Sequence, residues 1–241
     1  MIRQAVVVAG GRGTRLGKLA REYGNKALVP ICGQPILLHT VRWLKESGVK
    51  SIIVTVNYVR EFKKTSALFA GDKSVAVIGN LSRRNSAQCL PPIQGLLDPR
   101  YLFVYGHAPV PPEHLDKMEN EAGQGVVVSL FRSTTQREET QKQARFDGAR
   151  VVMDATGDLS IEPPHILNHE ITELLAQTES WKRSFQNYRG PIHGVVSEHP
   201  PEFHDKADLN QLCAWMAQRL PTAERVSAIE RSPTLPASDG G

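Results

Sequence analysis

The sequence predicts an α/β fold with a Rossmann-like, mostly parallel sheet flanked by helices, in one domain over residues 1–220. Two observations predict it. Short apolar runs typical of buried strands alternate with longer segments that carry an apolar stripe at helical spacing. The chain also begins with the order strand, helix, strand, helix, strand, which is typical of parallel sheets with right-handed crossovers. At 241 residues it is long enough to bury one sizeable core.

The first half contains the clearest elements. Strands are predicted as short apolar runs over 5–8, 51–56, 75–78 and 101–105. Helices with an apolar stripe are predicted over 36–46 and 59–69, and Gly48 ends the first of them. Ligands of parallel sheets bind beyond the carboxyl ends of the strands, which is where a glycine-rich stretch follows residue 8.

The second half continues the alternation. Its predicted elements are a helix over 111–121, a strand over 125–131, two turns at 147–148 and 157–158 between short strands, helices over 171–177 and 180–188, a strand over 192–196 and a helix over 207–220. Residues 132–143 are polar without apolar periodicity, so we expect an exposed loop or a short helix there. From Pro221 the chain turns to Pro, Ser, Gly and charge, which predicts a disordered tail over 221–241.

Composition indicates a soluble, cytoplasmic protein. Hydrophobic residues make up 40% and charged residues 22% of the chain, and no apolar run is long enough to cross a bilayer, so we expect no membrane association. The cysteines Cys32, Cys89 and Cys213 are widely spaced and odd in number. That pattern predicts three reduced thiols and no disulfide framework.

Positive charge is concentrated at the start of the chain. Residues 1–64 contain twelve Lys and Arg against three Glu, a net charge of +9 that leaves −5 on the remainder. A basic first quarter suits a nucleoside triphosphate. Aromatic residues are only 6% of the chain and do not interleave with the basic ones, so we expect no nucleic-acid partner.

The glycine-rich stretch over 9–16 predicts a site that wraps a polyphosphate. Three glycines within four residues let the backbone turn sharply and approach a ligand closely. Backbone N–H groups in such a turn form a concave anion site, to which arginine and lysine add charge. The residues that carry this interpretation are Ala9, Gly10, Gly11, Arg12, Gly13, Thr14 and Arg15, with Lys26 one short segment later.

Two other phosphate-binding loops are excluded by particular residues. A dinucleotide fingerprint needs a third glycine where this chain has Leu16, and an acid after the next strand, which ends at Val56-Asn57. A P-loop needs Ser or Thr after its Gly-Lys pair, where Leu19 follows Gly17-Lys18, and a glycine where Arg12 stands.

Residues 9–16, followed by the segment 26–37 that begins Lys26-Ala27-Leu28-Val29-Pro30, resemble the opening of the sugar-1-phosphate nucleotidyltransferases. The match joins two motifs at a family-like separation. The resemblance implies a fold of the nucleotide-diphospho-sugar transferase type and a role in nucleotide-sugar biosynthesis. It also implies Mg²⁺ as cofactor, and as substrates an NTP and a phosphorylated acceptor.

The resemblance assigns roles to particular residues of this chain. Arg15 and Lys26 would be catalytic, stabilising the leaving pyrophosphate and binding the α-phosphate region. The stretch 9–14 would bind the nucleotide. Glu162 matches the first residue of an E-K-P motif at the acceptor site, although the lysine is absent. Asp205 stands where relatives place a metal ligand, or else it caps the final helix.

Two further positions depart from the family pattern. The segment 85–90 stands where the family has a glycine-rich segment that contacts the nucleotide. Ser86 keeps a hydroxyl there, whereas the side chain of Gln88 would either crowd the base or read its edge by hydrogen bonds. Alternatively, the segment is the ordinary capped start of a helix. His107 stands where the family has the aspartate that holds magnesium. Histidine favours Mn²⁺, Co²⁺ or Zn²⁺, or contacts phosphate as imidazolium, or has no ligand at all.

The sequence therefore predicts an enzyme that transfers NMP from an NTP to a sugar phosphate or similar phosphorylated acceptor and releases pyrophosphate. The alternative is a catalytically degenerate nucleotide- or sugar-nucleotide-binding regulatory protein, suggested by His107 and the altered segment 85–90. Arg15 and Lys26 favour the enzyme. The base, the acceptor and the oligomeric state stay open, a homo-oligomer included.

Overall fold

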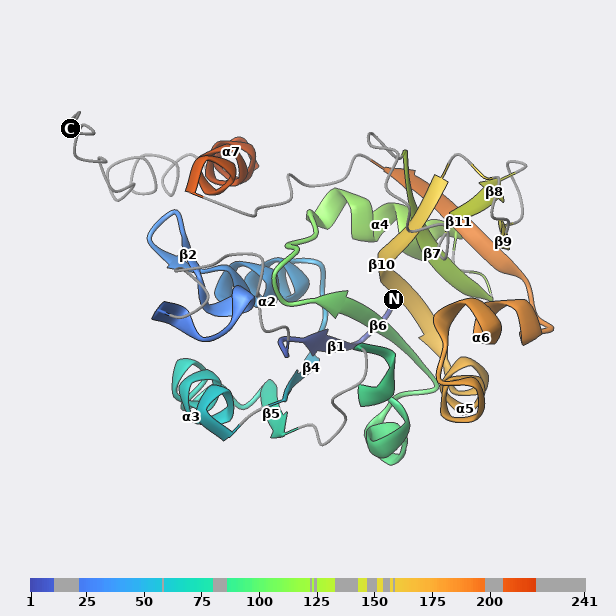
Figure 1. The fold of residues 1–241 in the computed structure, drawn as a ribbon, viewed down its shortest axis with the longest axis horizontal. Coiled ribbons are helices and arrows are strands. Elements are labelled where there is room, and N and C mark those ends of the chain that lie inside the picture. The colour runs from blue at the N-terminus through green and yellow to red at the C-terminus, as the bar shows by residue number, and fades with distance from the viewer. Residues whose placement is uncertain are drawn as a thin grey trace, which may run out of the picture.

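The computed structural model describes residues 1–10, 22–57, 59–79, 86–121, 123, 125–132, 143–146, 151–153, 157, 159–197 and 206–219. Within these ranges a nine-stranded sheet has the order β11-β7-β10-β6-β1-β4-β5, with β8 and β9 attached beside β10 (Figure 1). Strands β5, β4, β1 and β6 run parallel. The α/β fold with a mostly parallel sheet is thus confirmed.

The elements of the first half follow the sequence pattern closely. They are β1 (Gln4–Val8), a 3-10 turn η2 (Lys26–Leu28), a small hairpin of β2 (Pro30–Ile31) and β3 (Gln34–Pro35), α2 (Ile36–Glu46), β4 (Ser51–Val56), α3 (Val59–Leu68), β5 (Val75–Gly79), two 3-10 turns η3 (Ser86–Cys89) and η4 (Pro91–Leu96), and β6 (Arg100–Tyr105). Gly48 has φ +88°, so the chain leaves α2 through a left-handed residue.

The second half consists of α4 (Pro112–Glu121), β7 (Val126–Arg132), β8 (Gln143–Phe146), β9 (Val151–Met153), β10 (Leu159–Asn168), α5 (His169–Thr178), α6 (Trp181–Asn187), β11 (Ile192–Ser197) and α7 (Lys206–Ala217). Asn168 and Ser180 cap α5 and α6 with side-chain oxygens. Of the predicted exposed segment 132–143, only the two end residues are among the described ones. The predicted tail 221–241 lies entirely outside the described residues.

Alternating side chains place one apolar cluster on each face of the sheet. Ala5 and Val7 of β1 face the cluster that contains Leu37, Val41 and Leu44 of α2 together with residues of α4. Val6 and Val8 face the cluster formed with the two 3-10 turns η3 and η4, α5 and α6. Period-two alternation thus makes β1 a central strand that is buried on both sides.

Strand β10 differs from the sequence expectation. The sequence predicts only a short strand after the turn at 157–158, and the segment contains Pro163-Pro164, which cannot donate to a sheet ladder. The structure instead continues β10 to Asn168, antiparallel to both β6 and β7. A register shift against β7 between Glu162 and His165 accommodates the two prolines. The result is a ten-residue strand in the interior of a mixed sheet.

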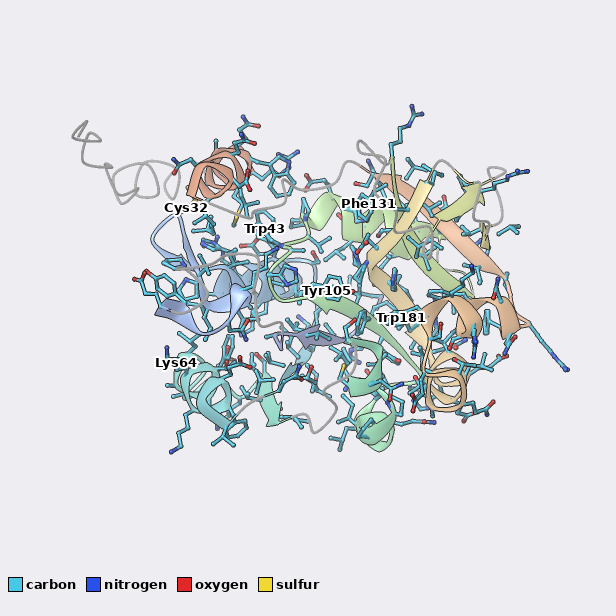
Figure 2. The ribbon with its side chains drawn as sticks, in the orientation of Figure 1. Cys32, Trp43, Lys64, Tyr105, Phe131 and Trp181 are labelled. Carbon is cyan, nitrogen blue, oxygen red and sulfur yellow. A yellow bond between two sulfur atoms is a disulfide. The ribbon has the colours of Figure 1, made fainter. Side chains whose placement is uncertain are left out.

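The expectation of three reduced cysteines is wrong for two of them. Cys32, in the β2–β3 hairpin, is joined by a disulfide to Cys213 of α7, 181 residues away, whereas Cys89 is free and buried. Figure 2 shows Cys32 directly beneath α7. Leu212 and Met216 of α7 also pack on a small apolar cluster with Trp43. Both the disulfide and this packing hold α7 against the hairpin.

Among the described residues, no helix is both long and apolar enough to span a bilayer.

Candidate functional site

Strand register brings the ends of three strands, β1, β4 and β6, to one edge of the sheet. Val8 lies opposite Thr55 of β4 and Tyr105 of β6. Just beyond these pairs, the Asn57 side chain donates to Gly10 O at 2.9 Å, and His107 lies in the turn that follows β6, where Ala108 N–H donates to Tyr105 O at 3.2 Å. Backbone hydrogen bonds extend the pairing past the strand ends, with Ala9 N–H donating to Thr55 O at 2.8 Å and Gly106 N–H to Val8 O at 2.9 Å. This edge is where parallel sheets bind ligands.

Glycines allow the close approach at this edge. A Cβ at Gly10 would lie 2.6 Å from Cγ of Asn57, and one at Gly106 would lie 3.0 Å from Leu37 and 3.2 Å from Ala9. Larger residues would push the strand ends apart. Thr40 of α2 donates to the carbonyl of Gly106 at 3.3 Å, which ties the turn before His107 to the helix.

Hydrogen bonds of the neighbouring residue Asn25 hold the backbone of Lys26 close to this edge. Lys26 is the first residue of η2 and is half-buried. The Asn25 side chain accepts the Ala27 N–H at 2.8 Å and donates to the carbonyl of Ala9. Residue 26 is thereby fixed beside the point where the chain leaves β1, although it is distant in sequence.

Tyr105, at the end of β6, contacts two predicted site residues, and a third lies in the same turn as one of them. Its hydroxyl lies 3.3 Å from the hydroxyl of Ser86, and its ring stacks on His107 with centroids 5.4 Å apart and planes at 12°. Gln88 is half-buried in the same 3-10 turn as Ser86. The altered segment 85–90 and His107 are thus linked through one aromatic side chain.

A small pocket opens beside Tyr105 towards β10 and α6. Its lining is largely aromatic or apolar, and Lys182 adds one positive charge: Tyr105, Ile161, Pro163, His165, Trp181, Lys182 and Phe185. Trp181 stacks on Phe185 with centroids 5.5 Å apart, and Tyr105 and Trp181 are labelled in Figure 2. Half-buried Glu162 alternates with the lining residues Ile161 and Pro163 along β10 and does not itself line the pocket, so its role at the acceptor site stays a prediction.

A buried histidine supports the irregular part of β10. Ser129 of β7 donates to the carbonyl of Pro164 at 2.8 Å, so it accepts from Nε2 of His114 at 2.7 Å. Nδ1 of His114 is buried with no hydrogen-bond partner in the part of the chain that the structure describes. Burial is the main cause that lowers the pKa of His114 to about 4, and Lys117 adds to it. The imidazole is therefore neutral at pH 7.

Cys89 is not a candidate nucleophile, although it lies in η3 beside Gln88. Burial raises the pKa of its thiol to about 12. A thiol reacts as the thiolate, so Cys89 is inert at neutral pH.

The structure brings together Ala9, Gly10, Ser86 and His107 near the strand ends, with Lys26 held nearby, whereas Glu162 does not line the adjoining pocket. Six predicted site residues lie outside the described ranges: Gly11, Arg12, Gly13, Thr14, Arg15 and Asp205. Sequence reasoning missed Asn25, Asn57, Tyr105 and Trp181. For Asn25 a signal was present, since asparagine before a helical turn is a favoured cap.

The described residues do not by themselves form a metal centre. They contain no group of three His, Cys, Asp or Glu side chains that could hold an ion. The His107 ring is packed face to face on Tyr105. A ligand role for His107 and Asp205 stays a prediction.

Comparison with known proteins shows what the chain is similar to. Residues 5–97 match the model of the MobA-like NTP transferase domain. The chain is 36% identical over 80 residues to the bifunctional IPC transferase and DIPP synthase of Aquifex aeolicus, covering 33% of this chain and 18% of that protein. It is 38% identical over 58 residues to choline-phosphate cytidylyltransferase of Streptococcus pneumoniae, covering 24% and 25%. The matches thus span a quarter or less of these relatives' length.

Solved structures show the same fold over most of the chain. The inositol-1-phosphate CTP transferase from T. maritima superposes with a TM-score of 0.72 at 13% identity, covering 98% of both chains. A UDP-glucose pyrophosphorylase from Acinetobacter baumanii gives 0.68 at 14% identity, covering 92% of this chain and 95% of that one. Residues 5–97 therefore resemble the MobA-like NTP transferase domain, and the chain as a whole shares the fold of these solved structures.

Proposed function

We propose that this protein is a nucleotidyltransferase that transfers NMP from an NTP to a phosphorylated small-molecule acceptor and releases pyrophosphate. The observation that carries the proposal is that the start of the glycine-rich stretch is held at the sheet edge by Asn57, with Lys26 fixed beside Ala9 through Asn25. The matching family model and the names of the relatives support the same reaction class.

The reaction needs positioning and charge neutralisation more than proton transfer. An oxygen of the acceptor phosphate attacks the α-phosphorus of the NTP, and the bond from that phosphorus to the oxygen bridging to the β-phosphate breaks. The acceptor phosphate is already an anionic nucleophile, so no general base is required. Lys26 would neutralise charge that develops at the α-phosphate, and Arg15 would stabilise the leaving pyrophosphate.

We further propose that Mg²⁺ accompanies the triphosphate, with Mn²⁺, Co²⁺ or Zn²⁺ preferred if His107 is a ligand. When bound, such an ion would add charge neutralisation at the phosphates. The described residues supply no complete ligand set, so no step of the mechanism is assigned to it.

The acceptor would lie against the aromatic side chains that surround the small pocket beside Tyr105. Relatives are named for acceptors as different as choline phosphate and mannose 1-phosphate. Both a sugar phosphate and a phosphoalcohol are therefore candidates for this chain.

The test is a pyrophosphate-release screen of the four NTPs against sugar phosphates and phosphoalcohols, with each of the four divalent metals. Turnover with any combination supports the proposal. NTP binding by calorimetry without turnover would favour the second candidate, a nucleotide-binding regulatory protein. The observation behind that candidate is His107 at a position where the resembled family has an aspartate. Neither turnover nor binding would defeat both.

A further inference from the structure

Two asparagine side chains hold the two consecutive carbonyls at which the chain leaves β1. Asn25 donates to Ala9 O, and Asn57 donates to Gly10 O at 2.9 Å. Ala9 is still attached to the sheet, since its N–H donates to Thr55 O. The side chains take over where the ladder of the sheet ends.

The side-chain amide of Asn25 makes two hydrogen bonds at once, one through its NH₂ and one through its oxygen. We call this double contact the bracket, because it fixes the spacing of the two segments that it joins. The side-chain NH₂ donates to the carbonyl of Ala9, and the side-chain oxygen accepts the N–H of Ala27. Lys26 lies in the chain between Asn25 and Ala27. Asn25 is only 1% exposed, so water cannot replace either bond. The bracket fixes the backbone of Lys26 relative to the end of β1.

The same contact orients the first peptide of the glycine-rich stretch. A trans peptide is planar, so holding the carbonyl of Ala9 also fixes the direction of the Gly10 N–H. Asn57 acts from the β4 side, where its amide lies so close to Gly10 that a Cβ would meet it at 2.6 Å. Oriented backbone N–H groups are what a phosphate-binding turn requires.

We propose that Asn25, assisted by Asn57, is a positioning residue that sets Lys26 and the glycine-rich stretch in register to bind a triphosphate. The inference rests on the proposed function, because it assigns Lys26 a phosphate-binding role. It adds that the lysine is effective only while the bracket holds it. Asn25 itself does not touch the reacting atoms in this assignment.

The test replaces one atom of the bracket. Asn25→Asp keeps an oxygen that can accept the Ala27 N–H but removes the donor to Ala9, and sets a carboxylate oxygen against a carbonyl oxygen. Asn25→Ser keeps a short cap without adding charge, and serves as a second variant if the aspartate prevents folding. We expect each to weaken binding of the preferred NTP with Mg²⁺, measured by calorimetry, about tenfold or more, and to lower kcat/KM in proportion.

Asn168→Asp is the matched control. Asn168 has the same double contact at the start of α5, accepting from Ile171 N–H at 3.1 Å and donating to the Tyr188 hydroxyl at 2.9 Å. It lies outside the proposed site. Its variant should lose melting temperature but keep NTP affinity and kcat/KM within about twofold of wild type.

A double-mutant cycle separates positioning from general destabilisation. Because Asn25 is proposed to act through both Lys26 and the Ala9–Gly10 peptide, Asn25→Ser should weaken NTP binding by a smaller factor in the Lys26→Ala background than in the wild-type background. Losses that multiply in the double variant would overturn the inference, as would wild-type affinity in both folded Asn25 variants. NTP binding by wild type without turnover would overturn the enzyme assignment alone, whereas no NTP binding at all would overturn the proposed function and the inference together.

Discussion

The two regions to which we assign the triphosphate and the acceptor, called here the phosphate side and the acceptor side, are built in different ways. On the phosphate side, glycines and asparagine amides control the backbone at the ends of β1 and β4. On the acceptor side, aromatic side chains from β6, β10 and α6 form the pocket. The family model covers the first region and ends at residue 97, before β6 begins. Backbone geometry demands particular residues, whereas a side-chain surface can be built from many sequences.

The largest expected effect tests the covalent tie between the first region and the end of the chain. Cys213→Ser should lower the free energy of unfolding by about 4 kcal/mol, measured by urea denaturation, because the disulfide closes a very long loop in the unfolded chain. Wild type with reductant should match the variant, and reductant should not affect the variant further. A wild-type stability insensitive to complete reduction would contradict the prediction.

Lys26→Ala tests the phosphate side directly. Losing one charged contact to the transition state should raise the barrier by ~3 kcal/mol, so that pyrophosphate release slows on the order of a hundredfold with little change in melting temperature. Arg15→Ala should behave alike. Lys64→Ala is the control, because Lys64 is an exposed lysine of α3 to which we assign no role in the site. Its ammonium group donates to the Tyr23 carbonyl at 3.4 Å. Wild-type rates in both Lys26→Ala and Arg15→Ala would remove the assignment.

His114 tests the support beneath the acceptor side. Its pKa is lowered to about 4 in the fold, so the unfolded chain binds a proton first as pH falls. The stabilisation is fully present above pH ~6.5 and is lost between there and pH ~4, amounting to about 2–3 kcal/mol. His114→Gln should flatten the pH dependence of the unfolding free energy in that window. Equal slopes for wild type and variant would show that His114 does not titrate as described.

The smallest effect separates the two sides by substrate. Trp181→Leu removes an aromatic wall of the pocket, worth about 1 kcal/mol, so KM for the acceptor should rise roughly fivefold while KM for the NTP stays unchanged. Trp215→Leu is the control, because Trp215 of α7 packs on Trp43 away from the pocket. A rise in the NTP KM instead would place the nucleotide, and not the acceptor, at Trp181.

Sequence patterns predicted the elements with strong periodicity. The bounds of α2 and β4 were predicted to the residue, since an apolar stripe and an apolar run each bury one well-defined face. Strand β10 is longer than the short strand predicted after residues 157–158, since a register shift against β7 accommodates its two prolines. The disulfide joins segments that no local spacing relates.

The candidate site divides in the same manner. Lys26 and the stretch from Ala9 could be predicted because glycine and lysine at those positions follow from phosphate chemistry. Asn25, Asn57 and Tyr105 could not, because each acts through one long-range contact that depends on where other segments lie.

The position of β10 determines when the sheet can complete its strand pairing during synthesis of the chain. This strand lies between β6 and β7, and both of those are synthesised before it. Until residue 168 has left the ribosome, the facing edges of β6 and β7 have no partner, and direct pairing between them would exclude β10. Unpaired strand edges are prone to wrong pairing and aggregation during folding. Completion of the sheet therefore waits for a strand whose proline pair weakens its own tendency to join edges at random.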